Sequence, residues 1–269
     1  SEMCIRDSYY NNIESLEKLF KDYPEKISCV IMEPFLFEKP EGEFLKQVES
    51  VTKKHGAVFI LDEMKTGFRF SLKGAGDYFG LDPDLSTFGK AVANGFSVAV
   101  LTGKEKIMKL GGIKGEHERV FLVSTTHGAE MPGLYAARET IAELKEKNVI
   151  EYLHKIGKKF WDGFSDLVKN LNLEEFISLI GYDVKPDFMF KDKKGNPSLP
   201  LRTLFHQEML KKDILIPWLA FSFSHTDDDI TRTLNAAEDS LKIYRKALHE
   251  GVEKYLKGSP IKPVFRKEN

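Results

Sequence analysis

Short apolar segments alternate with amphipathic helical segments through the first half of the chain. Residues 12–22 and 44–55 carry apolar side chains at helical spacing, and a glycine, Gly56, ends the second of these segments. Short β-type apolar runs are found at residues 27–32, 57–61, 84–88 and 97–101. Short strands that alternate with helices predict an α/β protein with a mostly parallel central sheet flanked by helices.

Helical periodicity dominates after residue 129. Long helices are predicted over residues 131–148 and 150–170, a further helix over 201–211, and strands at 177–181, 187–190 and 214–216. A final helix is expected to begin after Thr226, an N-cap residue followed by three aspartates that complement the helix dipole. We place the domain junction near Lys147, so that residues 9–147 belong to a large domain and residues 148–269 to a smaller C-terminal α+β domain.

Composition narrows the class of partner. The 269 residues include 40 basic and 41 acidic residues, which are mixed along the whole chain. They form no basic stripe of the kind that binds nucleic acid or an anionic membrane. No apolar run approaches the roughly 20 residues of a membrane span. Neither Cys4 nor Cys29 has metal-ligand spacing to another cysteine or histidine, so no metal site is expected. We therefore expect a small-molecule partner and a reducing, cytoplasmic compartment.

Candidate chemistry lies where two predicted strands end. Asp62 and Glu63 follow the apolar run 57–61, at the carboxyl end of a strand, where open α/β sheets bind ligands. Lys90 follows the run 84–88 and Gly89, and a lysine at such a turn can act as a covalent amine nucleophile when its surroundings lower its pKa.

These segments resemble the signature of class III aminotransferases, especially the branch around glutamate-1-semialdehyde aminomutase. The matching blocks, which occur in the family's order, are residues 62–69, 74–90, 124–128 and 223–230. The similarity extends from about Asn12 to the last helix. The resemblance implies a fold-type-I transferase that depends on pyridoxal 5'-phosphate (PLP).

The family's chemistry assigns a role to each matching residue. Lys90 would hold the cofactor as a Schiff base and then move a proton between the substrate carbon and the cofactor. Asp62 would pair with the pyridine nitrogen and keep it protonated. Thr126, or Thr125 in the alternative register, would donate a hydrogen bond to the phosphate of a neighbouring subunit's cofactor, which implies a homodimer with shared active sites. Glu33 follows another strand and is a weaker candidate for the substrate side.

The chain also departs from the family pattern. Residues 1–8 resemble a translated sequencing adapter, and we expect them to be non-native and the chain to be an N-terminally truncated fragment. The family's phosphate loop and its ring-stacking aromatic residue lie upstream of residue 9, so this chain alone is expected to bind the cofactor weakly or to be inactive. Residues 64–65, 94–96 and 125–130 also differ from commoner members, which leaves the substrate unassigned.

The same residues also have simpler interpretations. A strand-end aspartate is often a turn former, a lone lysine is usually a surface charge, and Thr125 and Thr126 could cap the following helix. The segment around Ser97 lacks the second glycine of a serine hydrolase elbow, and residues 74–76 are a weak partial glycine motif. Three functions stay open: an aminotransferase acting on an amino donor and an oxo acceptor, an intramolecular aminomutase, and an inactive binding or assembly module.

Overall fold

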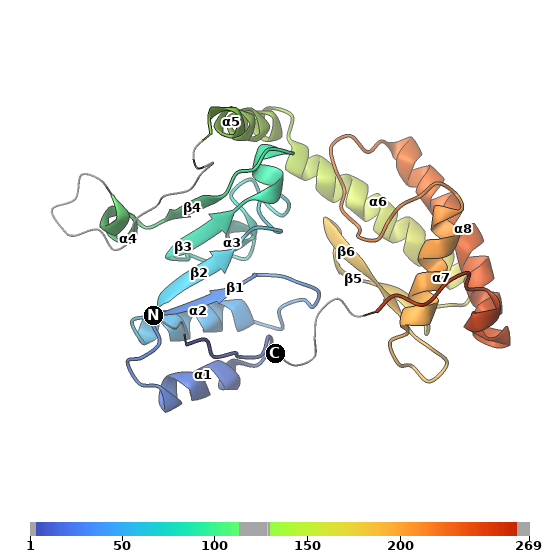
Figure 1. Ribbon diagram of the computed structural model, residues 1–269, viewed down its shortest axis with the longest axis horizontal. Coiled ribbons are helices and arrows are strands. Elements are labelled where there is room, and N and C mark those ends of the chain that lie inside the picture. The colour runs from blue at the N-terminus through green and yellow to red at the C-terminus, as the bar shows by residue number, and fades with distance from the viewer. Residues whose placement is uncertain (1–3, 113–127, 129, 263–269) are drawn as a thin grey trace. The chain divides into compact units, whose positions relative to one another are not determined.

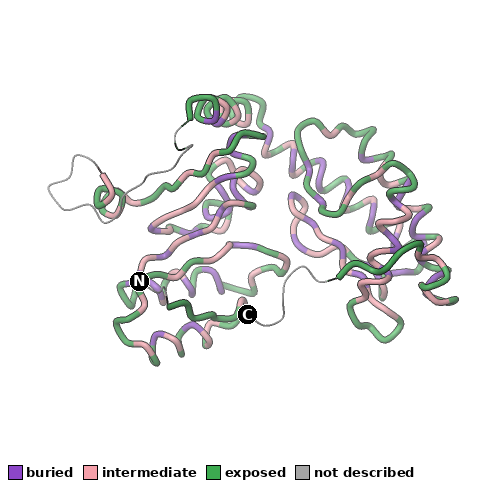
Figure 2. The backbone as a smooth tube through the Cα atoms, viewed as in Figure 1, coloured by how far each residue is buried: buried purple, intermediate pink, exposed green. Residues whose placement is uncertain are grey.

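The chain divides into two compact units. The computed structural model describes residues 4–112, 128 and 130–262, and the units are Ser1–Ile150 and Glu151–Asn269 (Figure 1). Each unit has its own secondary structure and its own buried residues, whose positions along the backbone are coloured purple in Figure 2.

A four-stranded sheet forms the centre of the first unit. Its strands β1 (Cys29–Met32), β2 (Val58–Asp62), β3 (Leu85–Phe88) and β4 (Val100–Gly103) lie side by side in that order. The first three strands are parallel and β4 runs antiparallel to β3. The predicted mostly parallel sheet is therefore confirmed. The strand expected at residues 97–101 begins later, at Val100, because the pairing with β3 starts only there.

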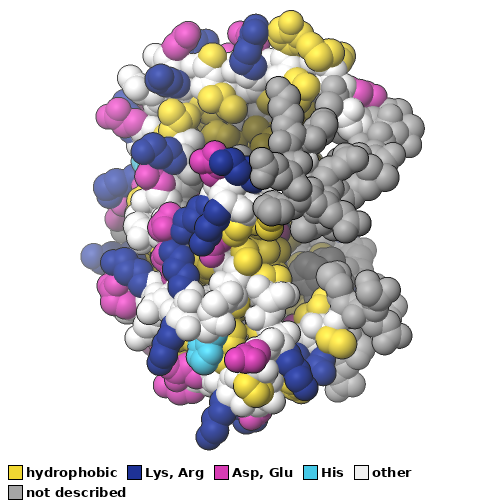
Figure 3. All heavy atoms as spheres, turned by 90° about the vertical axis from the view of Figure 1, so that its left-hand side faces the viewer, with side chains coloured by type: hydrophobic (Ala, Val, Ile, Leu, Met, Phe, Trp, Pro, Cys, Tyr) yellow, Lys and Arg dark blue, Asp and Glu magenta, His cyan; other side chains and the backbone are white. Residues whose placement is uncertain are grey.

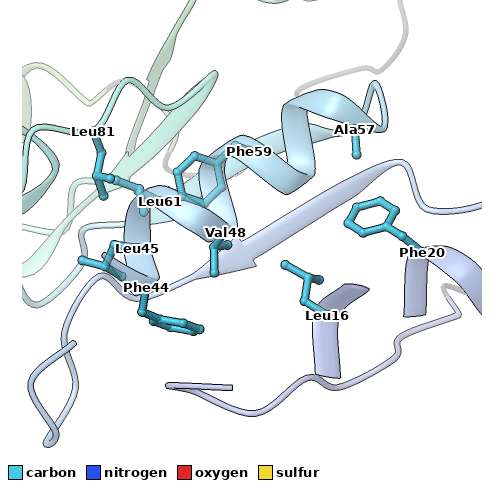
Figure 4. Close-up of a cluster of buried hydrophobic side chains, with 9 residues drawn as sticks. All are labelled: Leu16, Phe20, Phe44, Leu45, Val48, Ala57, Phe59, Leu61 and Leu81. Atoms are coloured by element: carbon cyan, nitrogen blue, oxygen red, sulfur yellow. The ribbon is translucent and has the colours of Figure 1, made fainter. Parts of the chain in front are cut away.

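Two helices bury one face of this sheet. Helices α1 (Ile13–Asp22) and α2 (Phe44–Lys54) contribute Leu16, Phe20 and Val48 to a cluster that also contains Phe59 and Leu61 of β2 (Figure 4). Phe59 and Leu61 alternate with half-buried residues along β2, as expected when one face of a strand meets the helices. Each such side chain contributes about 1.5–3 kcal/mol on burial. This cluster fixes β2, whose last residue is Asp62.

Asp84 joins β3 to β2 at the opposite end of the sheet. Its carboxylate is buried, accepts a hydrogen bond of 3.0 Å from the backbone N–H of Phe59, and lies 3.2 Å from Nζ of Lys104. Burial alone would raise the pKa of Asp84, but the Phe59 N–H and the Lys104 ammonium outweigh burial and hold this pKa below its ordinary value. Asp84 therefore fixes where the β2–β3 pairing starts.

Five further elements complete the described part of the first unit. They are α3 (Ala75–Tyr78), η1 (Lys90–Ala93), α4 (Glu105–Met108), η2 (Lys109–Gly111) and α5 (Met131–Glu146). Ala137 of α5 packs against Val92 and Ala93 of η1. The turn that follows β3 is thus held by a helix from much later in the sequence.

The second unit packs three helices and an antiparallel hairpin around aromatic side chains. Its elements are α6 (Val149–Asn170), β5 (Ile177–Tyr182), β6 (Lys185–Phe190), α7 (Leu199–Leu210), α8 (Asp227–Glu250) and η3 (Val252–Lys254). Phe160 and Phe164 of α6, Phe188 of β6 and Phe205 of α7 are buried, with ring centroids 5.0–6.4 Å apart in the contacting pairs. Such aromatic contacts stabilise the unit beyond the area that they bury.

His206 of α7 adjoins this aromatic cluster. Both of its ring nitrogens are buried, and no residue in the described part of the chain provides a hydrogen-bond partner for them. Its ring lies 5.7–6.2 Å from those of Phe188, Phe190 and Phe205. Burial, together with the charge of Arg202, lowers the pKa of His206 to about 4. The imidazole is therefore neutral near pH 7.

Predictions for the second unit had mixed outcomes. The start of the last helix is confirmed, since Thr226 caps α8 and forms a reciprocal capping box with Asp229. The predicted strand at residues 214–216 is wrong: these residues form no strand, and Leu215 is 76% exposed. The backbone N–H of Ile214 instead bonds to the carbonyl of Met209 and closes the end of α7. A short apolar run alone could not distinguish these outcomes.

Charges of both signs are mixed on the face that Figure 3 shows, with hydrophobic side chains between them. Within residues 4–112 and 130–262, none of the helices combines the length and the apolar character that crossing a bilayer requires.

Candidate active site

Three candidate residues lie at one edge of the sheet. Glu33 directly follows β1, Asp62 ends β2, and Lys90 follows β3 after Gly89. The registers Met32↔Leu61 and Asp62↔Thr87 align these three strand ends. Because the three strands are parallel, their carboxyl ends meet at the edge where open α/β sheets bind ligands.

The two oxygens of the Asp62 carboxylate have different surroundings. Oδ1 accepts a hydrogen bond of 2.9 Å from the backbone N–H of Met64 and one of 3.2 Å from Oγ1 of Thr87. Oδ2 accepts none from any residue that the structure describes. The bond to Met64 is a local turn contact of the type expected of a strand-end aspartate. One oxygen thus holds the carboxylate in place, and the other can accept a hydrogen bond from a ligand.

Lys90 presents an exposed amine. Across the described residues, no carboxylate pairs with it and no hydrogen bond involves its side chain. Its backbone has a φ of +46°, an uncommon left-handed conformation for a residue with a side chain. The preceding Gly89 is buried, and a Cβ there would lie 2.3 Å from Cε of Met64. Lys90 therefore sits on a tight turn, held by packing beneath it, with its amine available.

Glu63 is a structural carboxylate. It is only 2% exposed and accepts hydrogen bonds from Oγ1 of Thr66 at 2.6 Å and from the backbone N–H groups of Ala75 and Gly76 at 2.9 and 2.7 Å. A Cβ on Gly74, whose φ is +101°, would lie 2.7 Å from Oε1 of Glu63. Thr66, Ala75 and Gly76 thus donate hydrogen bonds to Glu63, and Gly74 leaves room for its carboxylate. Glu63 thereby closes the loop between β2 and α3.

Glu33 pairs with Lys65, one of the residues that depart from the family pattern, and the sequence did not predict this pairing. Oε1 of Glu33 lies 3.0 Å from Nζ of Lys65, while Oε2 is buried and accepts no hydrogen bond from the described part of the protein. A half-exposed ion pair contributes about 0–1 kcal/mol, whereas an unpaired buried oxygen costs about 1–3 kcal/mol. The pair is therefore poorly explained by stability alone.

Sequence reasoning also missed Thr87, whose hydroxyl contacts Asp62. A correct register for the β2–β3 pairing would have revealed it, because the two residues are direct cross-strand partners. Thr125 and Thr126, the candidate phosphate ligands, lie outside the described residues. Over the ranges that the structure describes, no group of three or more histidine, cysteine, aspartate or glutamate side chains could hold a metal ion.

Sequence comparisons identify a family. The pattern of Aminotransferase class-III matches residues 4–181. A glutamate-1-semialdehyde 2,1-aminomutase of Persephonella marina is 32% identical over 247 residues, which cover 87% of this chain and 57% of that protein. A 3-aminobutyryl-CoA aminotransferase of Cloacimonas acidaminovorans is 29% identical over 91% of this chain and 59% of that protein. The chain therefore spans somewhat more than half the length of these relatives.

Solved structures show the same fold. The FumI protein of Sphingopyxis sp. MTA144, determined in its PLP internal aldimine form, matches 90% of this chain and 57% of its own with a TM-score of 0.80 and 24% sequence identity. A transaminase with PLP bound matches the same shares with a TM-score of 0.79 and 17% identity. The predicted fold-type-I transferase architecture is confirmed.

Proposed function

The chain belongs to the class-III aminotransferases, and on that premise we propose that the protein is a PLP-dependent enzyme that moves an amino group between an amino donor and an oxo or aldehyde acceptor. The observation that carries the proposal is the arrangement of Asp62 and Lys90. They follow neighbouring parallel strands, and each offers an atom, Oδ2 or Nζ, without a partner among the described residues.

These two residues fit the cofactor. A carboxylate with one saturated oxygen and one available oxygen suits the protonated nitrogen of a pyridine ring, and an available amine suits a covalent link to an aldehyde. When bound, PLP withdraws electrons from the substrate carbon whose proton is removed. Asp62 would hold the ring nitrogen protonated through Oδ2, and Lys90 would hold the cofactor as a Schiff base.

Lys90 has a second role in this proposal. Its Nζ would also be the general base that takes a proton from the substrate carbon and returns it one position away. A base that shuttles a proton between two atoms needs freedom to move. The exposed side chain of Lys90, which has no ion pair in the described part of the chain, meets that need.

Further residues complete the proposed site. We assign Glu33 to the substrate side, supported by its place beside the Asp62 strand and by its unpaired buried Oε2. We assign the cofactor phosphate to Thr126, with Thr125 as the alternative, on the family resemblance alone.

The larger organisation is likewise proposed. Residues 9–147 would form part of the PLP-binding domain and residues 148–269 the small domain. The protein would act in the cytoplasm as a homodimer with shared active sites. The free, exposed Cys29 is consistent with a reducing compartment.

An intramolecular aminomutase is the second candidate. It is favoured by the 32% identity to a protein of that name. A mutase retains its intermediate through both half-reactions, whereas an aminotransferase releases an oxo product after the first. Incubating the cofactor-loaded protein with an amino donor alone separates the two: one equivalent of released oxo product indicates an aminotransferase, and no release indicates a mutase.

The proposal as a whole is tested by trapping the lysine. The protein expressed from its complete gene is loaded with PLP, reduced with borohydride and mapped by peptide mass spectrometry. We expect the label on Lys90 and its loss in Lys90→Ala, while Lys106→Ala, at an exposed lysine of α4, keeps the label. An unlabelled wild type without a visible cofactor band would contradict the enzyme assignment and favour the inactive binding or assembly module.

A further inference from the structure

We propose that Thr87 is a positioning residue for the cofactor ring. Its hydroxyl, together with the backbone N–H of Met64, occupies Oδ1 of Asp62 and thereby leaves Oδ2 as the oxygen that meets the ring nitrogen. This inference rests on the proposed function, because it concerns the same site. It adds a residue from a second strand to a contact assigned so far to Asp62 alone.

Strand register places Thr87 beside Asp62. The two residues are direct partners across the parallel β2–β3 pairing, so their side chains point to the same face of the sheet. The backbone extends the contact by one residue, since the N–H of Glu63 donates to the carbonyl of Thr87 at 2.9 Å. Thr87 therefore holds the end of β2 through its main chain and through its side chain.

The two donors restrict the carboxylate in complementary ways. The Met64 N–H comes from the turn that follows Asp62, and the Thr87 hydroxyl comes from the neighbouring strand. A single donor leaves the plane of the carboxylate freer to turn about its terminal bond. With both donors on Oδ1, turning this plane away from its observed position weakens two hydrogen bonds, so the direction of Oδ2 is fixed. A β-branched threonine suits this task because its own side chain has few accessible rotamers.

Preorganisation explains why this matters for the reaction. A carboxylate that already points its free oxygen toward the ring avoids reorganisation when charge develops on the cofactor. Misplacement of a catalytic group by a fraction of an ångström is enough to lower a rate substantially. A hydroxyl that served only to stabilise the sheet would not influence the bound cofactor.

The test compares two substitutions in the PLP-loaded protein expressed from its complete gene. Thr87→Val keeps the shape of the side chain and removes the hydroxyl, and Thr87→Ser keeps the hydroxyl. For Thr87→Val we expect kcat to fall about tenfold with little change in KM. A tenfold fall is the size expected for the loss of one hydrogen bond to a charged group. Thr87→Ser should retain the wild-type kcat within about threefold.

Two readouts do not depend on turnover. The dissociation constant of PLP from the apoprotein should rise about tenfold in Thr87→Val. The pH midpoint of the cofactor's visible band should also move upward, because a less firmly protonated ring withdraws fewer electrons from the imine nitrogen and makes that nitrogen more basic. Neither quantity should change in Thr87→Ser.

Thr102→Val is the matched control. It makes the same substitution on β4 of the same sheet, where Oγ1 of Thr102 donates to the backbone carbonyl of Ser86 at 3.4 Å and not to Asp62. If Thr87→Val behaves like this control in PLP affinity and pH midpoint, the inference is wrong although the proposed function stands. A wild type without a lysine-bound cofactor would refute both. If Thr87→Val does not fold, Thr87→Ala replaces it under the same criteria.

Discussion

Replacing Glu63 with glutamine should destabilise the first unit more than any surface change. The carboxylate is 2% exposed and accepts three hydrogen bonds, from Thr66, Ala75 and Gly76. A glutamine keeps one oxygen, which can serve Thr66 and Ala75, but its NH₂ group then faces the N–H of Gly76 across a distance of 2.7 Å. The charge-assisted bond from Gly76 is lost, and its buried N–H is left unsatisfied. The two remaining bonds, from Thr66 and Ala75, then have an uncharged acceptor.

The magnitude follows from these losses. A hydrogen bond to a charged group is worth about 1.5–3 kcal/mol, and an unsatisfied buried donor costs about 1–3 kcal/mol. Allowing for partial relaxation, we expect Glu63→Gln to lower the free energy of unfolding by about 3–5 kcal/mol. With a urea dependence of about 2 kcal/mol per molar, the midpoint should fall by roughly 1.5–2.5 M.

The assay can resolve the two units. Both tryptophans, Trp161 and Trp218, lie in the second unit, so their fluorescence reports on that unit, whereas far-ultraviolet circular dichroism reports on both. We expect the dichroism transition to shift and the fluorescence midpoint to remain. Glu17→Gln, at an exposed position of α1, is the matched control and should change stability by less than about 0.5 kcal/mol. A shift in Glu63→Gln no larger than in this control would refute the reasoning.

Three further predictions concern packing and charge. Asp84→Asn should lower the free energy of unfolding by about 1.5–3 kcal/mol at pH 7 and by less at lower pH. The pKa of Asp84 is lowered in the folded state, so its contribution to stability is present above the ordinary pKa of about 4 and is lost as the pH falls through the folded pKa. Urea midpoints at pH 7 and pH 3 measure this difference, and an equal loss of stability at both would contradict the prediction. His206, whose folded pKa is about 4, should lower the free energy of unfolding of the second unit by roughly 2–3 kcal/mol as the pH falls from about 6.5 toward 4, because the unfolded chain binds the proton first. In His206→Phe, the urea midpoint followed by tryptophan fluorescence should depend less steeply on pH. An unchanged slope would exclude His206 as the origin of this pH dependence. Gly157→Ala should destabilise the second unit by about 1–3 kcal/mol or more, because the new Cβ would lie 2.2 Å from the backbone oxygen of Asp183; a thermal midpoint equal to that of the wild type would show that the hairpin can move away.

Local patterns in the sequence predicted most of the secondary structure. The helix after Thr226 could be predicted because its capping residue, its acidic first turn and its apolar stripe agree. The run at residues 214–216 could not be assigned correctly, since a strand needs a partner that no local pattern reveals. The start of β4 was misjudged for the same reason: its first residue is set by pairing with β3, which is a long-range property.

The sequence predicted which strand ends carry the site residues, but it did not predict the contacts that these residues make. Parallel topology alone brings Glu33, Asp62 and Lys90 to one edge. The family resemblance assigned the cofactor contact to Asp62, but the sequence did not reveal the structural role of its neighbour Glu63, because that role depends on a loop that folds back and delivers backbone donors to Glu63. The pairing of Glu33 with Lys65 joins residues 32 positions apart, and neither residue signals the other in the sequence.

Strand β1 has a consequence for handling the protein. It lies at one end of the described sheet and pairs on one side with β2, and Ile31 in its middle is 60% exposed. A strand whose other edge offers free N–H and C=O groups beside an outward apolar side chain is a template for pairing with a strand of another molecule. Concentrated solutions of the chain should therefore self-associate through this edge, and a lysine in place of Ile31 should keep the molecules apart.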